Sequence, residues 1–241
     1  MATSRVGSSP GEASGRRIAA SVVGLACGLL VAAAAAAAPD GTSIIAHGVG
    51  IAHGVGIAHG VGTAPACATC HGATGQGNAA IGAPALAGDG VAYLREQLRN
   101  FASGQRVNPI MQPIAHALTP AERAAVAASF AAMAAPAPPP VAARTNPLGA
   151  SLARRGRWSI GLPGCTQCHG PQGIGVGPHF PHLAGLTAPY ITAQLAAFRA
   201  GTRPGGPLGL MGHVAQKLLP PEIAAVAAYF GGSSGAEGKT P

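Results

Sequence analysis

The chain has 241 residues and a formal net charge of +8, with many Ala, Gly and Pro residues but only 9% charged and 4% aromatic residues. This length predicts two small globular domains, and the scarcity of bulky side chains predicts that a large apolar cofactor fills part of each core. Residues 40–241 carry twelve Lys or Arg and six Asp or Glu, a formal charge of +6 that is too weak a signal to indicate a nucleic-acid partner.

Residues 1–38 have the pattern of an export signal. Arg5, Arg16 and Arg17 precede a continuous apolar run, and small residues follow it before Pro39. We therefore expect cleavage near residues 36–38 and a periplasmic protein, with retention as a membrane anchor, and so loose membrane association, as the alternative. Cys27 lies inside the apolar run and is interpreted as part of the signal.

Residues 39–63 are predicted to form a low-complexity linker. The sequence Ile-Ala-His-Gly-Val-Gly occurs three times in tandem from Ile45 to Gly62. Its histidines, His47, His53 and His59, could bind a metal ion, but two glycines in every six residues oppose helix formation. A flexible linker is therefore the preferred interpretation.

The first predicted domain, residues 64–133, begins with Cys67-Ala-Thr-Cys70-His71. C-x-x-C-H is the attachment motif of c-type haem, because two thiols three positions apart on a helical turn can each form a thioether while the adjacent imidazole binds the iron. We predict covalent haem attachment at Cys67 and Cys70, with His71 as an axial iron ligand.

Two longer helices are predicted later in this domain. Apolar residues recur at helical spacing from Val91 to Ser103, and Gly104 is placed to end that helix. Thr119-Pro120-Ala121-Glu122 is a capping box that opens a second helix, which extends through Phe130. No segment of the chain shows sustained strand alternation, so the fold class is all-α.

Residues 134–146 are rich in Pro and Ala and are predicted to be a linker before the second domain, residues 147–232, which is followed by a flexible tail at residues 233–241. The second domain repeats the first, which indicates internal duplication. We call residues 67–130 the first copy and residues 165–230 the second copy. The matched pairs are Pro84 and Pro181, Leu86 and Leu183, Gly88 and Gly185, Tyr93 and Tyr190, Gln97 and Gln194, Leu98 and Leu195, Phe101 and Phe198, Gly104 and Gly201, and Arg106 and Arg203.

The second domain therefore carries a second haem motif, Cys165-Thr-Gln-Cys168-His169, with Cys165 and Cys168 as attachment residues and His169 as axial ligand. It also has a predicted first helix from Pro147 to Arg155. The repeats occupy the corresponding place in the first domain, so an N-terminal helix is doubtful there.

Methionines at equivalent points supply the predicted second axial ligands. Met111 and Met211 lie 40 and 42 residues beyond the two motif histidines, whereas Met133 has no counterpart and is interpreted as a packing residue. Bis-histidine ligation is the alternative, with the candidates His116, His213, His179 and His182. We expect backbone carbonyls near Pro84 and Pro181 to orient the proximal imidazoles.

Two other interpretations of the cysteines were weighed. A four-cysteine zinc site would have to join two motifs separated by ninety-four residues in an oxidising compartment. A thioredoxin-like motif would require a βαβ setting that the helical pattern does not provide. Both are less consistent with the sequence than two haem sites.

Together these motifs resemble the diheme cytochrome c4 family, two fused class I cytochrome c domains, over residues 64–231. The resemblance implies two covalently bound haem c groups with His and Met ligands, and periplasmic electron delivery toward a terminal oxidase. Asp89 and Leu186 occupy positions where the family usually has glutamine. Arg106 and Arg203 are candidate partners of the haem propionates.

The predicted function is electron transfer between a respiratory donor and an acceptor, with no catalytic residues. The candidate partners are redox proteins: a quinol-oxidising cytochrome complex, a terminal oxidase or a periplasmic dehydrogenase. A haem c subunit of a periplasmic dehydrogenase, or a diheme redox enzyme, is the alternative. A peroxidase would need a displaceable ligand, and a thiosulfate-oxidising enzyme would need cysteine ligation, whereas each copy offers a methionine.

Overall fold

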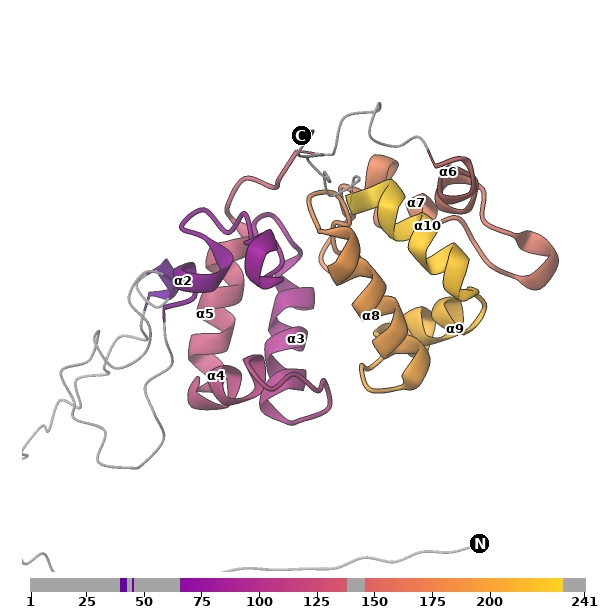
Figure 1. Ribbon diagram of the computed structural model, residues 1–241. Helices are drawn as coiled ribbons and strands as arrows, with labels where there is room; N and C mark the ends of the chain where they lie inside the picture. The colour runs from indigo at the N-terminus through magenta and orange to yellow at the C-terminus, as the bar shows by residue number, and fades with distance from the viewer. Residues whose placement is uncertain (1–39, 43–44, 46–65, 138–145, 232–241) are drawn as a thin grey trace, which may run out of the picture. The chain divides into compact units, whose positions relative to one another are not determined.

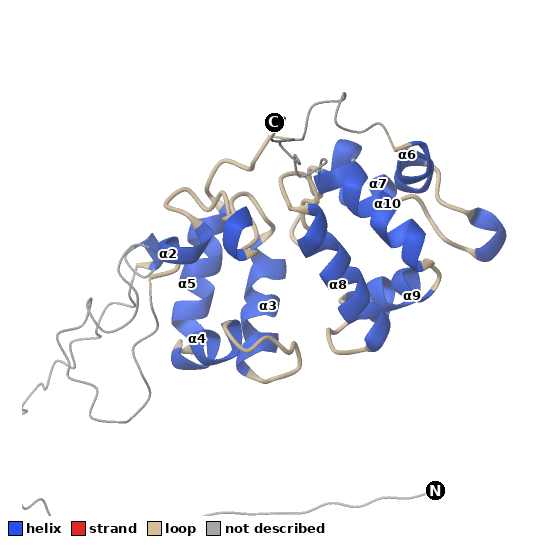
Figure 2. Cartoon of the chain, viewed as in Figure 1, coloured by secondary structure: helices blue, strands red, loops and turns tan. Residues whose placement is uncertain are grey.

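The structure is a computed structural model that describes residues 40–42, 45, 66–137 and 146–231. The predicted signal, most of the His-Gly repeats, part of the Pro/Ala linker and all of the predicted tail lie outside these ranges. Within them the chain forms helices and turns, with β-bridges only as isolated pairs, as the predicted all-α class requires (Figure 2). None of the described helices has the length and apolar character that crossing a bilayer requires.

The first copy is built around two packed helices. Helix α3 (Val91–Ala102) packs against both α5 (Pro120–Ala131) and α4 (Met111–Ala117) (Figure 1). The short α2 (Ala68–His71) and the 3-10 helix η1 (Ala79–Ile81) precede them. Helix α3 ends one residue earlier than predicted, and Gly104 follows with φ +76°.

The second copy repeats this arrangement. Helix α10 (Pro220–Gly231) packs against α8 (Ala188–Ala200) and α6 (Pro147–Arg154) (Figure 1). The remaining elements are α7 (Cys165–His169), α9 (Leu210–Gln216) and the 3-10 helices η3 (Trp158–Ile160), η4 (Pro171–Gly173) and η5 (Pro207–Gly209). Gly201 caps α8 in the left-handed conformation, as its place after the apolar pattern predicted.

The doubt about an N-terminal helix in the first domain is corrected by the structure. Gly41, Thr42 and Ile45 are helical, and Ile45 is 3% exposed and belongs to the first hydrophobic core. A Cβ atom at Gly41 would overlap the carbonyl oxygen of Ala125, just as one at Gly149 in α6 would overlap that of Ala225. Gly41 and Thr42 precede the His-Gly repeats and Ile45 is their first residue, so helical residues lie within residues 39–63, where the sequence predicts only a linker.

The last helix of each copy begins with the same kind of hydrogen bond, from a backbone N–H to the carboxylate of a glutamate three residues later. The capping box is present as predicted: Thr119 Oγ1 accepts a hydrogen bond from Glu122 N–H, and the Glu122 carboxylate accepts one from Thr119 N–H. In the second copy, Glu222 accepts the equivalent bond from Leu219 N–H at 2.8 Å. Its carboxylate also binds Arg157 at 2.6 and 3.2 Å, which joins α10 to the segment after α6.

Each copy has its own hydrophobic core, centred on the matched phenylalanines Phe130 and Phe230. Met133 packs against the first core, in agreement with its interpretation as a packing residue. Both copies belong to one compact unit of the chain, residues 37–241.

Candidate haem sites

The first motif histidine is held by a backbone carbonyl. His71 ends α2, its ring is buried, and its Nδ1–H donates to Pro84 O at 2.9 Å. Burial lowers the pKa of His71, and the hydrogen bond to Pro84 raises it by a smaller amount. Because the Nδ1 proton is fixed in this way, the neutral imidazole keeps its Nε2 lone pair available for a metal.

The second motif repeats this geometry. His169 ends α7 and donates from Nδ1–H to Pro181 O at 2.7 Å. Burial likewise lowers the pKa of His169, with the hydrogen bond again opposing the shift. The predicted role of the carbonyls of Pro84 and Pro181 is therefore confirmed, and two imidazoles in two copies are oriented alike.

The four motif cysteines are free thiols on short helical turns. Burial raises the pKa of Cys67 and of Cys165 to about 11, so these thiols are protonated at neutral pH and lack the activated thiolate of a redox-active C-x-x-C pair. No group of three or more His, Cys, Asp or Glu side chains in the described ranges is arranged to hold a metal ion.

The two candidate methionines begin equivalent short helices. Met111 is the first residue of α4, and its N–H donates to Asn108 Oδ1 at 2.8 Å. Met211 is the second residue of α9, donates from its N–H to Gly205 O at 2.9 Å and packs against the second core. Both methionines are only partly buried.

The histidines considered as alternative ligands lie in other surroundings. His116, His179 and His213 are exposed. His182 is 2% exposed, but its Nδ1–H donates to Ala184 O at 2.8 Å and its Nε2 lies 3.5 Å from Asp89 Oδ2. Protein groups therefore flank both ring nitrogens of His182.

Two buried arginines form a network that crosses between the copies. Arg106 donates to Gln97 Oε1 of its own copy at 2.8 Å, and to Tyr190 Oη at 3.1 Å and Gln194 Oε1 at 2.7 Å of the other. Arg203 mirrors it, donating to Gln194 Oε1 at 2.8 Å, Tyr93 Oη at 2.9 Å and Gln97 Oε1 at 3.2 Å. The sequence repeat identified all six residues as matched pairs, but not that each arginine bonds to the opposite copy.

This network fits a cofactor that carries negative charge. Arg106 and Arg203 are 7% and 6% exposed, yet no ion pair within the described ranges involves either guanidinium, and Arg203 Nε is buried without a hydrogen-bond partner. Neither guanidinium has a carboxylate within ion-pair distance in the described ranges, and haem propionates have the charge and the oxygen acceptors that would complete their surroundings. Together with two free thiols and one oriented imidazole per copy, this donor set suits haem c.

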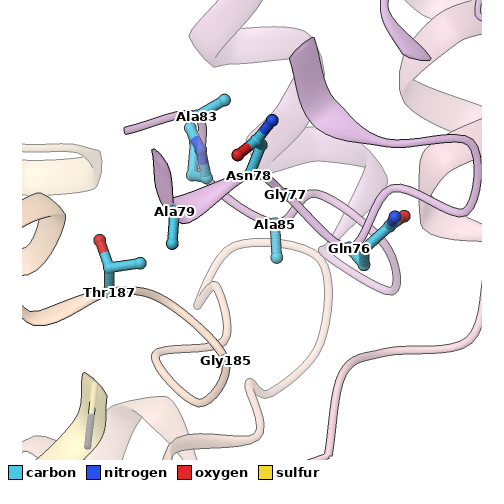
Figure 3. Close-up of a pocket in the computed structure, with 9 residues that line it drawn as sticks. Gln76, Gly77, Asn78, Ala79, Ala83, Ala85, Gly185 and Thr187 are labelled. Carbon is cyan, nitrogen blue, oxygen red and sulfur yellow. The ribbon is translucent and has the colours of Figure 1, made fainter. Parts of the chain in front are cut away.

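A shallow cavity of about 250 Å³ lies near the Pro84 carbonyl segment (Figure 3). Its lining has amide, hydroxyl and small apolar side chains from both copies, and it includes Gln76, Asn78 and Thr187. None of the lining residues has an ionisable side chain.

Comparison with known proteins identifies the family. The cytochrome c family model matches residues 62–128 and 155–232. The crystal structure of reduced cytochrome c4 from Pseudomonas stutzeri superposes with a TM-score of 0.61 at 33% identity, covering 69% of this chain and 92% of that chain. The chain belongs to the diheme cytochrome c4 family. It is an electron-transfer cytochrome with two covalently bound haem c groups, one for each class I cytochrome c domain, and is not itself an enzyme.

Two further family relatives are connected by name with thiosulfate oxidation. A protein of Stutzerimonas stutzeri (strain A1501) named thiosulfate dehydrogenase electron acceptor is 53% identical over 169 residues, 68% of this chain and 77% of the relative. The structure of thiosulfate dehydrogenase TsdBA from Marichromatium purpuratum superposes with a TM-score of 0.66 at 42% identity. This match covers 79% of the present chain but only 39% of that longer one.

One contact in this region was missed by the sequence analysis. Asp89 Oδ1 of the first copy accepts a hydrogen bond from His182 N–H of the second at 2.9 Å, in a buried position. The only signal was that Asp89 departs from the glutamine usual in the family. His182 corresponds to Ala85, and Asp89 to Leu186, so this contact does not follow the repeat.

Proposed function

We propose that the chain is exported to the periplasm and works there as a two-haem electron shuttle. In this proposal Cys67, Cys70, Cys165 and Cys168 attach the two haems, while His71 and Met111 bind one iron and His169 and Met211 bind the other. The observation that carries the assignment is the hydrogen bond from each motif imidazole to a proline carbonyl, which leaves Nε2 free in both copies.

The bound haems supply reversible one-electron chemistry between ferric and ferrous iron. The cysteines of each motif would hold a haem by two thioethers, and the Pro84 and Pro181 carbonyls fix the orientation of the imidazoles. Met111 and Met211 would each supply a sulfur ligand to the iron, so that electron transfer would need little rearrangement. Arg106 and Arg203 offset the negative charge of the propionates inside the protein.

For the electron donor we propose a thiosulfate-oxidising dehydrogenase, and for the acceptor a terminal oxidase. The names of the relatives support the donor, and the match of this chain to part of the longer thiosulfate dehydrogenase TsdBA supports a close association between such a cytochrome and its dehydrogenase. A quinol-oxidising complex or another periplasmic dehydrogenase is the alternative donor. A stable complex with the dehydrogenase, rather than transient encounters, would make this chain its haem c subunit.

The test is stopped-flow reduction of the purified diheme protein by a purified thiosulfate dehydrogenase and thiosulfate, followed in the α-band of the haem spectrum. We expect both haems to be reduced, and neither when thiosulfate or the dehydrogenase is omitted. Absence of reduction by the dehydrogenase, with full reduction by dithionite, would reject the donor but not the electron-carrier function.

Size-exclusion chromatography of the two proteins together separates a shuttle from a subunit. The shuttle elutes apart from the dehydrogenase, whereas a subunit elutes with it. Haem staining and intact mass of the same sample count the haems and determine the processing of residues 1–38. A mature protein without covalent haem would contradict the proposed sites.

A further inference from the structure

We propose that Asp89 of the first copy is a positioning residue that lowers the redox potential of the haem in the second copy, through the peptide group between Pro181 and His182. The inference rests on the proposed ligation of iron by His169. It assigns a role to a residue at which this chain departs from its family.

The first step is a continuous chain of hydrogen bonds. His169 Nδ1–H donates to Pro181 O at 2.7 Å, and the N–H of the same peptide group, that of His182, donates to Asp89 Oδ1 at 2.9 Å. A single peptide unit therefore connects a carboxylate of the first copy with the axial imidazole of the second.

The second step is electrostatic. A carboxylate that accepts the peptide N–H draws its proton away and increases the negative charge on the carbonyl oxygen of the same peptide, because hydrogen bonds in a chain polarise one another. The carbonyl then becomes a stronger acceptor for His169 Nδ1–H. A more strongly hydrogen-bonded imidazole is a better electron donor to iron and stabilises the ferric state.

The groups involved are buried, so water does not screen this electrostatic effect. Asp89 is 6% exposed and His182 is 2% exposed. Burial raises the pKa of Asp89 by more than the charge on His182, the His182 N–H bond and Arg203 lower it. The resulting pKa is about 6, so the carboxylate is ionised above that pH. The groups that face Asp89 are therefore the His182 ring, the His182 peptide, Arg203 and the hydroxyl of Tyr93.

The effect is confined to one haem because the contact does not follow the repeat. In the first copy the equivalent peptide lies between Pro84 and Ala85, and the residue that corresponds to Asp89 is Leu186. Leucine has no acceptor to offer the Ala85 N–H. The two haems, in otherwise matched sites, are thus given different potentials, with the second lower than it would be without Asp89.

The experiment is a spectroelectrochemical titration of the diheme protein and its Asp89→Asn variant at about pH 8. Asparagine can still accept the His182 N–H but carries no charge. We expect the equilibrium constant for reduction of the second haem to rise roughly tenfold in this variant. For one electron, this is an increase of about 59 mV in its redox potential. The first haem changes by less. A Met211→His variant identifies the second haem, because histidine in place of methionine lowers only its potential.

Two further readouts separate this role from simple support of the fold. The NMR signal of His169 Nδ1–H moves in the Asp89→Asn variant, while that of His71 stays in place. In the unsubstituted protein the second potential falls as the pH rises through about 6, because the proton leaves Asp89, and Asp89→Asn abolishes this dependence. Glu96→Gln, which removes a carboxylate from an exposed pair with Arg99, is the matched control and leaves both potentials unchanged.

The outcomes distinguish the two proposals. Two six-coordinate haems whose potentials and His169 signal are unaffected by Asp89→Asn would overturn this inference and leave the electron-carrier function intact. A second haem that His169 does not ligate in the unsubstituted protein would overturn both.

Discussion

Methionine sulfur binds ferrous iron more strongly than ferric iron, so the residue that closes each coordination sphere sets both the spectrum and the potential of that haem. The chain offers three methionines beyond its predicted signal. Two of them, Met111 and Met211, begin equivalent helices with partly buried side chains, whereas Met133 packs against the first core. The placement of these side chains makes the ligand assignment testable one residue at a time.

Replacing Met111 or Met211 by alanine should leave one iron five-coordinate. We expect loss of the far-red charge-transfer band of one ferric haem and binding of one carbon monoxide per ferrous protein, measured by absorption spectroscopy. Met133→Leu is the matched control and keeps both haems closed to carbon monoxide. If neither alanine variant binds the gas, the methionine assignment is wrong.

Asp89 should also make the stability of the protein depend on pH. Its native pKa of about 6 is higher than the value of 3.8 for a free side chain, so the native state binds the proton more tightly than the unfolded state between these values. The stabilisation from this group is complete below about pH 4 and is lost as the pH rises through about 6. Two pKa units correspond to about 3 kcal/mol.

Urea titrations at about pH 4.5 and pH 7.5 check the sign. Asp89→Asn should be more stable relative to the unsubstituted protein at about pH 7.5 than at about pH 4.5, because asparagine removes the buried charge that is present only at the higher pH. An identical difference in unfolding free energy at the two pH values would show that burial does not raise the pKa of Asp89. A buried charge that costs stability at neutral pH is easier to explain if it serves the haem beside it.

At the scale of elements, close helix approach explains where glycine is required. Gly149 in α6 lies against the backbone of α10, and Gly41 lies in the same way against Ala125 of α5. This shared contact indicates that Gly41 packs on α5 as Gly149 of α6 packs on α10. The sequence pattern does not predict helix at Gly41, Thr42 and Ile45, because the apolar signal around Ile45 runs directly into the glycine-rich repeats.

Gly149→Ala tests this contact by the sign of its effect. Helix propensity alone predicts that alanine stabilises α6 by about 0.5 to 1 kcal/mol. The overlap with the Ala225 carbonyl predicts a loss of about 1 to 3 kcal/mol instead, because α6 and α10 must move apart. Denaturant unfolding of the diheme protein measures the difference, and a gain in stability would reject the close approach.

At the scale of the whole molecule, the two copies are joined by bonds between matched residues. Each buried guanidinium binds a glutamine of its own copy together with a glutamine and a tyrosine of the other. Each also lies over a phenylalanine ring of its own copy, with the guanidinium carbon 4.4 Å and 4.3 Å from the centroids of Phe101 and Phe198. Two positive charges are thus fixed in the interior where haem propionates can neutralise them.

Arg106→Gln should therefore lower the potential of at least one haem by an amount on the order of 1 kcal/mol per electron, because a buried positive charge favours the ferrous state. Arg106→Lys keeps the charge and should change the potential less. Arg99→Gln, at an exposed arginine, is the control for loss of surface charge. Potentials that do not respond to Arg106→Gln would contradict the proposed propionate contact.

The sequence by itself determined the local chemistry: the haem motifs, the paired methionines, the capping box at Thr119 and the duplication. These features depend on residue type and short spacing, which covalent attachment and helix geometry dictate directly. The tertiary structure decided which residues meet across the two copies, namely the crossed arginines and the bond from His182 to Asp89. Such contacts join residues eighty or more positions apart, and their pairing depends on how two packed domains face each other, which no local pattern encodes.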